Sequence, residues 1–301
     1  MELLITLHKK ENFKEICKLN ISGVIFGSSF SHGYQLTLEE LVDINDKCLK
    51  SNFKRYISIN SLIQEKDLEQ LDAYLDLVKE LDVDGIYFSD FAVANKAYEK
   101  NMQDKLIYDP YNLNTNGKDI AFFGEYDIPS VLSRELTLDE IKEIVSSRPF
   151  LCDVQIFGHL RIAESKREYI SNYYRNFNIN ENPKDKETFT IKEQTRDYKM
   201  PIMEDKYGTC IYTDYIYAMF TELADISKYI NRAIIDDIFV EPELVNDYVR
   251  ALEKVNDENI DILKDSITKN HPNVSLTSGY LFQKTVNVKE KDEQDWVIST
   301  C

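Results

Sequence analysis

The chain of 301 residues carries a formal net charge of −17, because it has 53 acidic and 36 basic residues. Nucleic-acid binding depends on Lys and Arg that neutralise phosphates, so this balance argues against a protein that holds RNA on its own. No apolar run approaches the ~18 residues of a membrane helix, and the first residues lack the basic region and cleavage site of a signal peptide. A soluble protein of the cytoplasm, with no membrane partner, is therefore expected.

The five cysteines indicate reduced thiols. Their number is odd, and no two of them have the Cys-x-x-Cys spacing that is typical of a zinc site. A His-Glu-x-x-His pair, which would indicate a zinc protease, is also absent from the sequence. The sequence therefore predicts no metal ligands and no cofactor.

Strands and helices alternate from the amino terminus with the regularity of βα units. Apolar runs predict strands over residues 2–7, 23–26, 55–60, 85–90, 106–109 and 128–132. Helices are predicted over residues 11–19, 38–52, 66–81 and 93–101, with a short helix inside 114–123. Thr37 with Glu40, and Thr137 with Glu140, have the spacing of capping boxes, which bind the free amides at a helix start.

The second half of the chain continues this alternation around an insertion. A buried strand is predicted over residues 151–157, and a helical or turn-rich region follows to about residue 174. A polar, Asn-rich stretch and two extended segments with a turn at Lys206-Tyr207-Gly208 then predict a β-hairpin insertion over about 176–212. The remaining predictions are a helix over 214–230, an eighth strand over 233–240, a helix that begins at Pro242, and an extended segment over 275–288.

Eight βα-like units between residues 1 and 255 predict a (β/α)8 barrel of the TIM type, an α/β fold. Such a barrel needs ~200–250 residues, which this stretch supplies. Residues 256–301 are then a C-terminal extension. The alternative is an open doubly wound sheet, but the sequence has no glycine-rich fingerprint for binding a nucleotide there.

The carboxyl ends of all barrel strands meet at one rim, so polar residues that follow the strands are candidates for a site. His159 is the candidate general acid–base, because an imidazole titrates near neutral pH, and Glu135 on the same rim is the second catalytic candidate. His159 could instead be a structural histidine bonded to a loop carbonyl, while His32 lies in a Gly/Ser-rich turn and is expected to be exposed. The substrate-binding candidates are Arg134, Arg161, Arg167, Asn112, Gln155 and Asp109.

Two interpretations of the arginines are open. Arg134, Arg161 and Arg167 could together present planar guanidinium groups to a carboxylate or phosphate, which would suit a small acidic ligand. Alternatively, Arg134 could pair with Glu135 and Arg161 with Glu168, since buried arginines usually need partners and such pairs brace loops.

Four segments of the chain resemble peptidase family U32, the collagenase-like peptidases. In the main segment a strand ends at Gly158 and runs on to Arg167 and the triplet Ser171-Asn172-Tyr173. The other three segments cover residues 132–136, 200–209 and 277–280. The resemblance implies a barrel core, in agreement with the strand count.

Longer members of that family carry cysteines inside the main segment, and an iron–sulfur cluster is ascribed to them. When the triplet that begins at Ser171 fixes the register, the two nearby cysteine positions fall on Arg161 and Glu168. An iron–sulfur cluster needs thiolate ligands, which neither a guanidinium nor a carboxylate can replace. The resemblance therefore implies a short form that has lost the cluster.

Three functions follow from this resemblance. Some bacterial relatives take part in hydroxylating the wobble uridine of tRNA, and an acidic short form fits a component that reaches tRNA only through a longer, cysteine-bearing paralogue. The family name suggests a collagenase-like peptidase instead, although the sequence offers no assignable nucleophile. The third alternative is a non-catalytic barrel that binds a small molecule or a protein.

Overall fold

The computed structural model describes residues 1–33, 35–180, 189–192 and 198–283. Its centre is a closed barrel of eight parallel strands, in which the last strand pairs with both the first and the seventh. The strands are β1 (Glu2–Leu7), β2 (Gly23–Phe26), β3 (Lys54–Ile59), β4 (Gly85–Phe88), β5 (Leu106–Tyr108), β6 (Ser130–Val131), β7 (Cys152–Gly158) and β13 (Arg232–Ile235). The predicted (β/α)8 barrel is confirmed.

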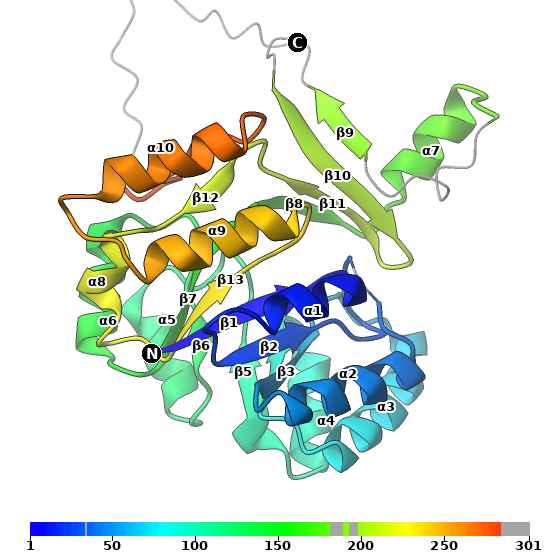
Figure 1. Ribbon diagram of the computed structural model, residues 1–301. Helices are drawn as coiled ribbons and strands as arrows, with labels where there is room; N and C mark the ends of the chain where they lie inside the picture. The colour runs from blue at the N-terminus through cyan, green and yellow to red at the C-terminus, as the bar shows by residue number, and fades with distance from the viewer. Residues whose placement is uncertain (34, 181–188, 193–197, 284–301) are drawn as a thin grey trace, which may run out of the picture.

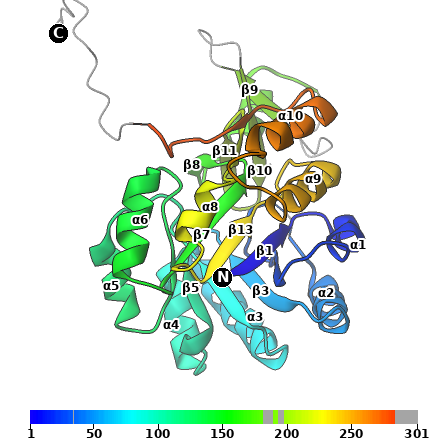
Figure 2. The same cartoon turned by 60° about the vertical axis from the view of Figure 1, so that its left-hand side comes forward.

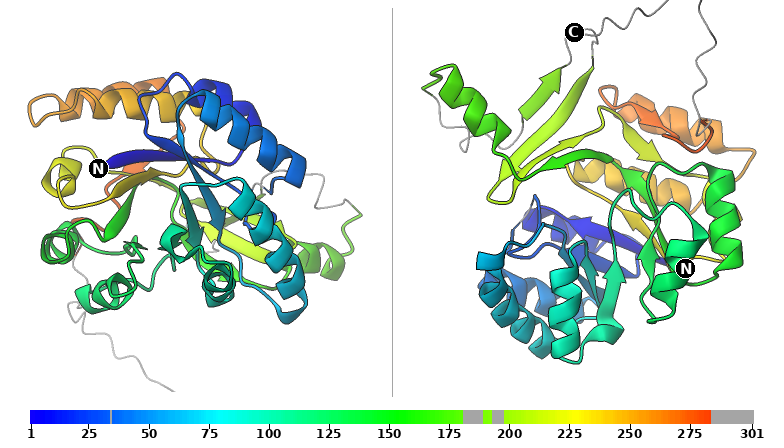
Figure 3. Two further views of the ribbon diagram at one scale, coloured as in Figure 1. Left: turned by 90° about the horizontal axis from the view of Figure 1, so that it is seen from below. Right: turned by 180° about the vertical axis from the view of Figure 1, so that it is seen from behind.

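Helices surround the barrel, as the view from below in Figure 3 shows. They are α1 (Phe13–Ile16), α2 (Leu38–Lys50), α3 (Leu68–Glu80), α4 (Phe91–Glu99), α5 (Gly117–Gly124), α6 (Leu138–Ser147), α8 (Glu222–Ile226), α9 (Pro242–Leu252) and α10 (Ile260–Asn270). Both predicted capping boxes are present: Thr37 and Thr137 accept the N–H of Glu40 and Glu140, whose side chains bind the threonine N–H in return. Among the described residues, no helix has both the length and the apolar composition needed to cross a bilayer.

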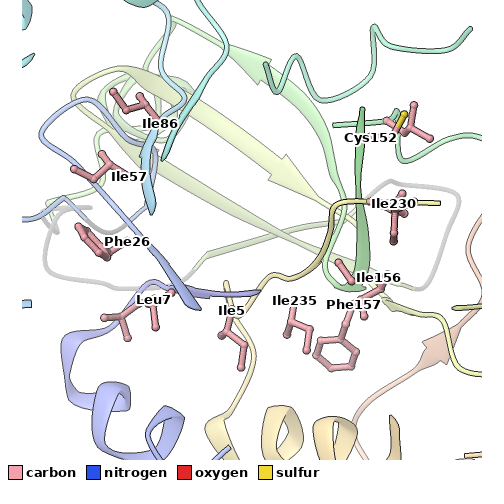
Figure 4. Close-up of a cluster of buried hydrophobic side chains, with 14 of the residues drawn as sticks. Ile5, Leu7, Phe26, Ile57, Ile86, Cys152, Ile156, Phe157, Ile230 and Ile235 are labelled. Atoms are coloured by element: carbon pink, nitrogen blue, oxygen red, sulfur yellow. The ribbon is translucent and has the colours of Figure 1, made fainter. Parts of the chain in front are cut away.

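Alternation along the strands divides the apolar side chains between two layers. Residues such as Leu7, Phe26 and Ile57 point outward and pack under the helices (Figure 4). The inner layer contains one apolar or aromatic residue from every barrel strand except β7. These residues are Leu4, Ile25, Tyr56, Tyr87, Ile107, Val131 and Ile234. At the alternate positions of β7 stand Asp153, which accepts the Tyr87 hydroxyl at 2.8 Å, and Gln155. The interior therefore has one polar side, which leads up to the carboxyl end of the barrel.

Several predicted segments differ from the structure, among them the eighth strand, which was predicted over 233–240 and ends at Ile235 as β13. The region predicted as helical or turn-rich after β7 begins with strand β8 (Arg161–Ser165), and the helix predicted over 214–230 is a strand, β12 (Ile216–Ala218), followed by the short α8. The helix predicted over 11–19 is only one turn, because a 3-10 turn over Lys10–Asn12 takes its start. Each missed strand is held by a partner that is distant in sequence, so its own short pattern does not reveal it.

Strand β12 extends the barrel sheet at the carboxyl end of β7. It pairs antiparallel with that end and parallel with β14 (Leu276–Thr277). Only β14 confirms the extended segment predicted over 275–288, because residues 279–283 form a turn. Residues from 284 onward lie outside the described part of the chain. The division into a barrel of residues 1–255 and an extension of 256–301 stays a prediction.

The insertion is a four-stranded antiparallel sheet that stands out from the barrel together with a helix (Figures 1 and 2). The predicted hairpin is present as β10 (Lys199–Asp205) and β11 (Gly208–Tyr212). Strands β8 and β9 (Phe189–Lys192) join it in the order β8-β11-β10-β9. Helix α7 (Tyr169–Asn176) packs on this sheet through the buried Ile170.

His32 fastens the insertion to the barrel. It was expected to be exposed, but its side chain is buried between two carboxylates of the insertion: Nδ1 lies 3.1 Å from Asp205 Oδ2, and Nε2 lies 3.1 Å from Glu164 Oε1. Burial alone would lower the pKa of His32, but hydrogen bonds with Asp205, Cys210 and Glu164 outweigh burial and raise that pKa to about 11. Both ring nitrogens therefore carry protons, and the imidazolium joins two anions.

We expect Gly158→Ala to lower the free energy of unfolding by more than ~1 kcal/mol. Gly158 has φ +119°, and a Cβ there would lie 2.3 Å from the carbonyl oxygen of Asp236. The matched control is Gly117→Ala at the start of α5, where the nearest atom is 3.8 Å away and the helix should gain from alanine. Urea unfolding measures both variants, and equal stabilities would contradict the prediction.

Replacing His32 by Gln should flatten the dependence of stability on pH. The pKa of His32 rises from 6.5 to about 11 on folding, so its contribution to stability is complete below pH ~6.5 and is lost as the pH rises toward ~11. Between about pH 7 and about pH 9 the wild-type free energy of unfolding should fall ~1.4 kcal/mol per pH unit more steeply than that of His32→Gln. Parallel slopes in urea titrations would show that the buried imidazole is neutral.

Candidate functional site

A small polar cavity of about 50 Å³ lies at the carboxyl ends of the barrel strands. Asp109 after β5, Arg134 after β6 and Gln155 on β7 line it, and these three were predicted as substrate-binding residues. The same cavity is also lined by residues that the sequence reasoning did not select, among them Thr6, His8, His32, Asn60, Tyr111 and Asp236.

Four hydrogen bonds hold the Arg134 side chain in the cavity. Its Nη1 and Nη2 donate to the two oxygens of Asp109 at 2.6 and 3.0 Å, and its Nε donates to Gln155 Oε1 at 2.8 Å. Nη1 also reaches the carbonyl oxygen of Tyr111 at 3.1 Å. The carboxylate that pairs with Arg134 is thus Asp109, not Glu135. A bidentate pair of this kind fixes the plane of the guanidinium and leaves one N–H of Nη2 unused among the described residues.

Tyr111 stands between two arginines. Its ring centroid lies 4.3 Å from the guanidinium carbon of Arg134 and 3.2 Å from that of Arg161. Its hydroxyl accepts a hydrogen bond from Asn60 at 2.9 Å. Its backbone is left-handed, with φ 62°, a conformation that a bulky residue adopts only when its surroundings force it. The ring therefore fills the space between the two cations at the cost of local strain.

Arg161 connects this site to the insertion. Its Nη2 lies 3.0 Å from Glu164 Oε2, and Glu164 also binds His32. The predicted partner Glu168 is exposed at the start of α7. Charges of alternating sign thus run from Asp205 through His32, Glu164 and Arg161 to the Tyr111 ring. The buried cations and the partly buried carboxylates of this row neutralise one another, although the acids are not the ones that the bracing interpretation named.

The other predicted residues lie outside the cavity. Asn112 Nδ2 donates to Glu135 Oε1 at 2.9 Å on the exposed rim, and the Arg167 side chain is exposed. His159 is buried, its Nδ1 lies 2.7 Å from the carbonyl oxygen of Thr213, and burial lowers its pKa. A bond to a loop carbonyl is the arrangement of the structural alternative, and catalytic roles for His159 and Glu135 stay predictions.

A second polar group adjoins the cavity and was missed in the sequence. His8 follows β1, and Asp236 and Asp237 follow β13, its neighbour in the barrel. His8 Nε2 lies 3.0 Å from Asp236 Oδ1, and Thr6 Oγ1 lies within 3.1 Å of one oxygen of each carboxylate. Burial raises the pKa of Asp237 to about 6. The carboxyl-end rule would have selected His8, whereas Asp236 and Asp237 were hidden inside the strand predicted over 233–240, which in the structure ends at Ile235.

This second group borders an open pocket of about 630 Å³. His8 and Asp237 line the pocket together with Gly33, Met203, Phe239 and Glu241. Because His8 and Asp236 also line the small cavity, the group separates the interior of the barrel from this open space. Among the described residues, His8, Asp236 and Asp237 form the one group of histidine, cysteine and carboxylate side chains that could hold a metal ion.

The amino-acid sequence is similar to those of several known proteins. The tRNA hydroxylation protein P2 of Bacillus subtilis is 27% identical over 271 residues, which cover 87% of this chain and 86% of that protein. An uncharacterized protease of Methanocaldococcus jannaschii is 29% identical over 46% of this chain and 34% of its own. A collagenase of Porphyromonas gingivalis is 25% identical over 48% of this chain and 37% of its own.

Solved structures with a similar course of the chain include a U32 peptidase, at 11% identity and a TM-score of 0.46, with 78% of this chain and 92% of that chain covered. A D-psicose 3-epimerase of Clostridium cellulolyticum has 9% identity and a TM-score of 0.41, with 92% and 100% covered. The model of peptidase family U32 matches residues 24–291, which include the segment from β7 through β8 to α7 that carried the resemblance. The chain belongs to peptidase family U32.

Proposed function

We propose that this chain is a component of tRNA wobble-uridine hydroxylation, the synthesis of 5-hydroxyuridine, and that it acts with a longer, cysteine-bearing paralogue. The observation that carries the proposal is the extent of its likeness to the tRNA hydroxylation protein P2, which covers most of both chains. The likenesses to the protease and the collagenase cover about half of this chain and little more than a third of either relative. A bacterial, cytoplasmic location follows from the proposed role.

The proposed lack of an iron–sulfur cluster is supported by the residues at the family's cysteine positions. Arg161 is committed to Glu164 and to the Tyr111 ring, and Glu168 is exposed. Four cysteines lie in the described part of the chain, and no group of metal-ligand type found there contains one of them. A cluster requires several thiolates that converge, so the redox chemistry is assigned to the paralogue.

The size of the cavity beside Arg134 limits the ligand that it can hold. A space of about 50 Å³ holds water or a very small molecule, whereas ligand pockets usually measure ~300–1,000 Å³. A uridine does not fit beside Arg134 while Tyr111 occupies its present position. We therefore assign a small acidic ligand to the unused N–H of Arg134. We assign tRNA contact to the paralogue because this chain carries a net charge of −17.

The peptidase alternative has its support in family membership and in the partial likeness to the collagenase. Glu135 on the exposed rim and the neutral His159 are the groups that it would need. The non-catalytic alternative assigns the same cavity to ligand binding without turnover.

Deletion of the gene is expected to abolish 5-hydroxyuridine-derived wobble nucleosides in tRNA, as measured by mass spectrometry of digested tRNA. The wild-type gene should restore them, and Arg134→Lys should restore less than about a tenth, because lysine cannot form the bidentate bond to Asp109. Arg250→Lys, on an exposed side chain of α9 outside the cavity, is the matched control and should complement fully. Unchanged nucleosides in the deletion strain would rule out the proposed function.

An affinity-tagged copy of the chain, expressed at its natural level, should copurify with a longer cysteine-bearing member of the family. Mass spectrometry of the purified complex identifies the partner, and iron and sulfide analysis should find the cluster in that partner alone. Stoichiometric iron and sulfide in the isolated chain would contradict the proposed division of labour.

A further inference from the structure

We propose that His8, Asp236 and Asp237 bind one divalent transition-metal ion at the closing edge of the barrel, between the small cavity and the open pocket. This site is independent of the proposed tRNA function. It also differs from the cysteine positions of the family's main segment, because its ligands follow β1 and β13.

The separations of the ligand atoms suit such an ion. His8 Nε2 lies 3.0 Å from Asp236 Oδ1 and 4.0 Å from Asp237 Oδ1, and one ligand atom from each residue falls within 4.8 Å of the others. Metal–ligand bonds of ~2.0–2.2 Å place neighbouring ligand atoms ~3–3.5 Å apart. The three side chains would therefore need only small movements to close around an ion.

The hydrogen bonds at this site leave ligand atoms unused. All bonds to Asp236 from Thr6, His8 and the Ile238 N–H end on Oδ1, and the bonds to Asp237 from Thr6 and the His8 N–H also end on Oδ1. Among the described residues, no group donates to Oδ2 of either carboxylate. Neither Oδ2 is among the buried unpartnered atoms of the described residues, so both oxygens are open to water or to a cation although the Asp237 side chain is only 3% exposed.

The single Thr6 hydroxyl cannot satisfy both acids. Its Oγ1 lies 3.1 Å from Asp236 Oδ1 and 3.0 Å from Asp237 Oδ1, but it has one proton to donate at a time. The same oxygen accepts the N–H of Asp237 at 2.9 Å, which fixes its position. Thr6 thus orients two carboxylates without neutralising them, as groups behind metal ligands do.

Access and ligand type define the class of ion. The open pocket gives a route to His8 and Asp237, and three protein ligands leave positions for water or a small acidic ligand. One imidazole with two carboxylates suits Mn²⁺, Fe²⁺ or Zn²⁺ better than a soft ion that prefers sulfur.

Isothermal titration calorimetry of the full chain, first freed of metal by a chelator, tests the site with MnCl₂ as the probe. Wild-type protein should bind one Mn²⁺ per chain, and Asp237→Asn and His8→Gln should each weaken binding at least tenfold. The control is His271→Gln, because His271 Nε2 pairs with Asp247 Oδ2 at the same 3.0 Å but has no second carboxylate. That variant should bind Mn²⁺ as the wild type does.

Absence of Mn²⁺ binding by the wild type, or equal binding by Asp237→Asn, would overturn the proposal. Asparagine keeps the shape of the side chain and removes a buried charge, so Asp237→Asn remains informative even when His8→Gln fails to fold. Electron paramagnetic resonance of the wild-type complex gives a second readout, since protein ligands reduce the signal of hydrated Mn²⁺. These outcomes do not depend on tRNA, so the metal site and the proposed function fail separately.

Discussion

Closure of the barrel by β13 is the constraint on which the site depends. Because β13 pairs with both β1 and β7, residues from the two ends of the fold become neighbours. Thr6 and His8 meet Asp236 and Asp237 across one of these seams, and Gly158 lies against the Asp236 backbone across the other. The Gly158 conformation lets β7 end there without a clash. The polar inward positions of β7 can then contact residues that follow the neighbouring strands.

Above this seam the site is built from charges that neutralise one another. Arg134 is held by Asp109, Arg161 by Glu164, and His32 by two carboxylates, so a barrel mouth rich in ionisable groups carries little unpaired charge. Isolated buried charges would be far more costly, which explains why each cation contacts an acid, with Glu164 shared by Arg161 and His32. The exceptions are the second oxygens of Asp236 and Asp237. Tyr111 separates the two arginines, and its left-handed backbone shows that this position is locally strained.

Local patterns revealed most of the fold and only part of the site. The capping boxes at Thr37 and Thr137 and the first strands were predictable because the residues that determine them are adjacent in sequence. Strands β8 and β12 were not, since their partners come from β11 and from the end of β7. His32 appeared exposed in a Gly/Ser turn because the acids that bury it arrive more than a hundred residues later. Asp109, Arg134 and Gln155 were found by the carboxyl-end rule, whereas the partner of Arg161 depended on the unrecognised strand that carries Glu164.

The pairing of β1 with β13 also affects synthesis of the protein. Glu2 pairs with Arg232, so β1 leaves the ribosome long before its second neighbour has been translated. During that interval one edge of β1 has unpaired backbone groups and apolar side chains, which is the condition that favours association between nascent chains. Slow non-local pairing lengthens the exposure. A temporarily open edge on the growing polypeptide is thus a consequence of the topology, whatever reaction the mature protein serves.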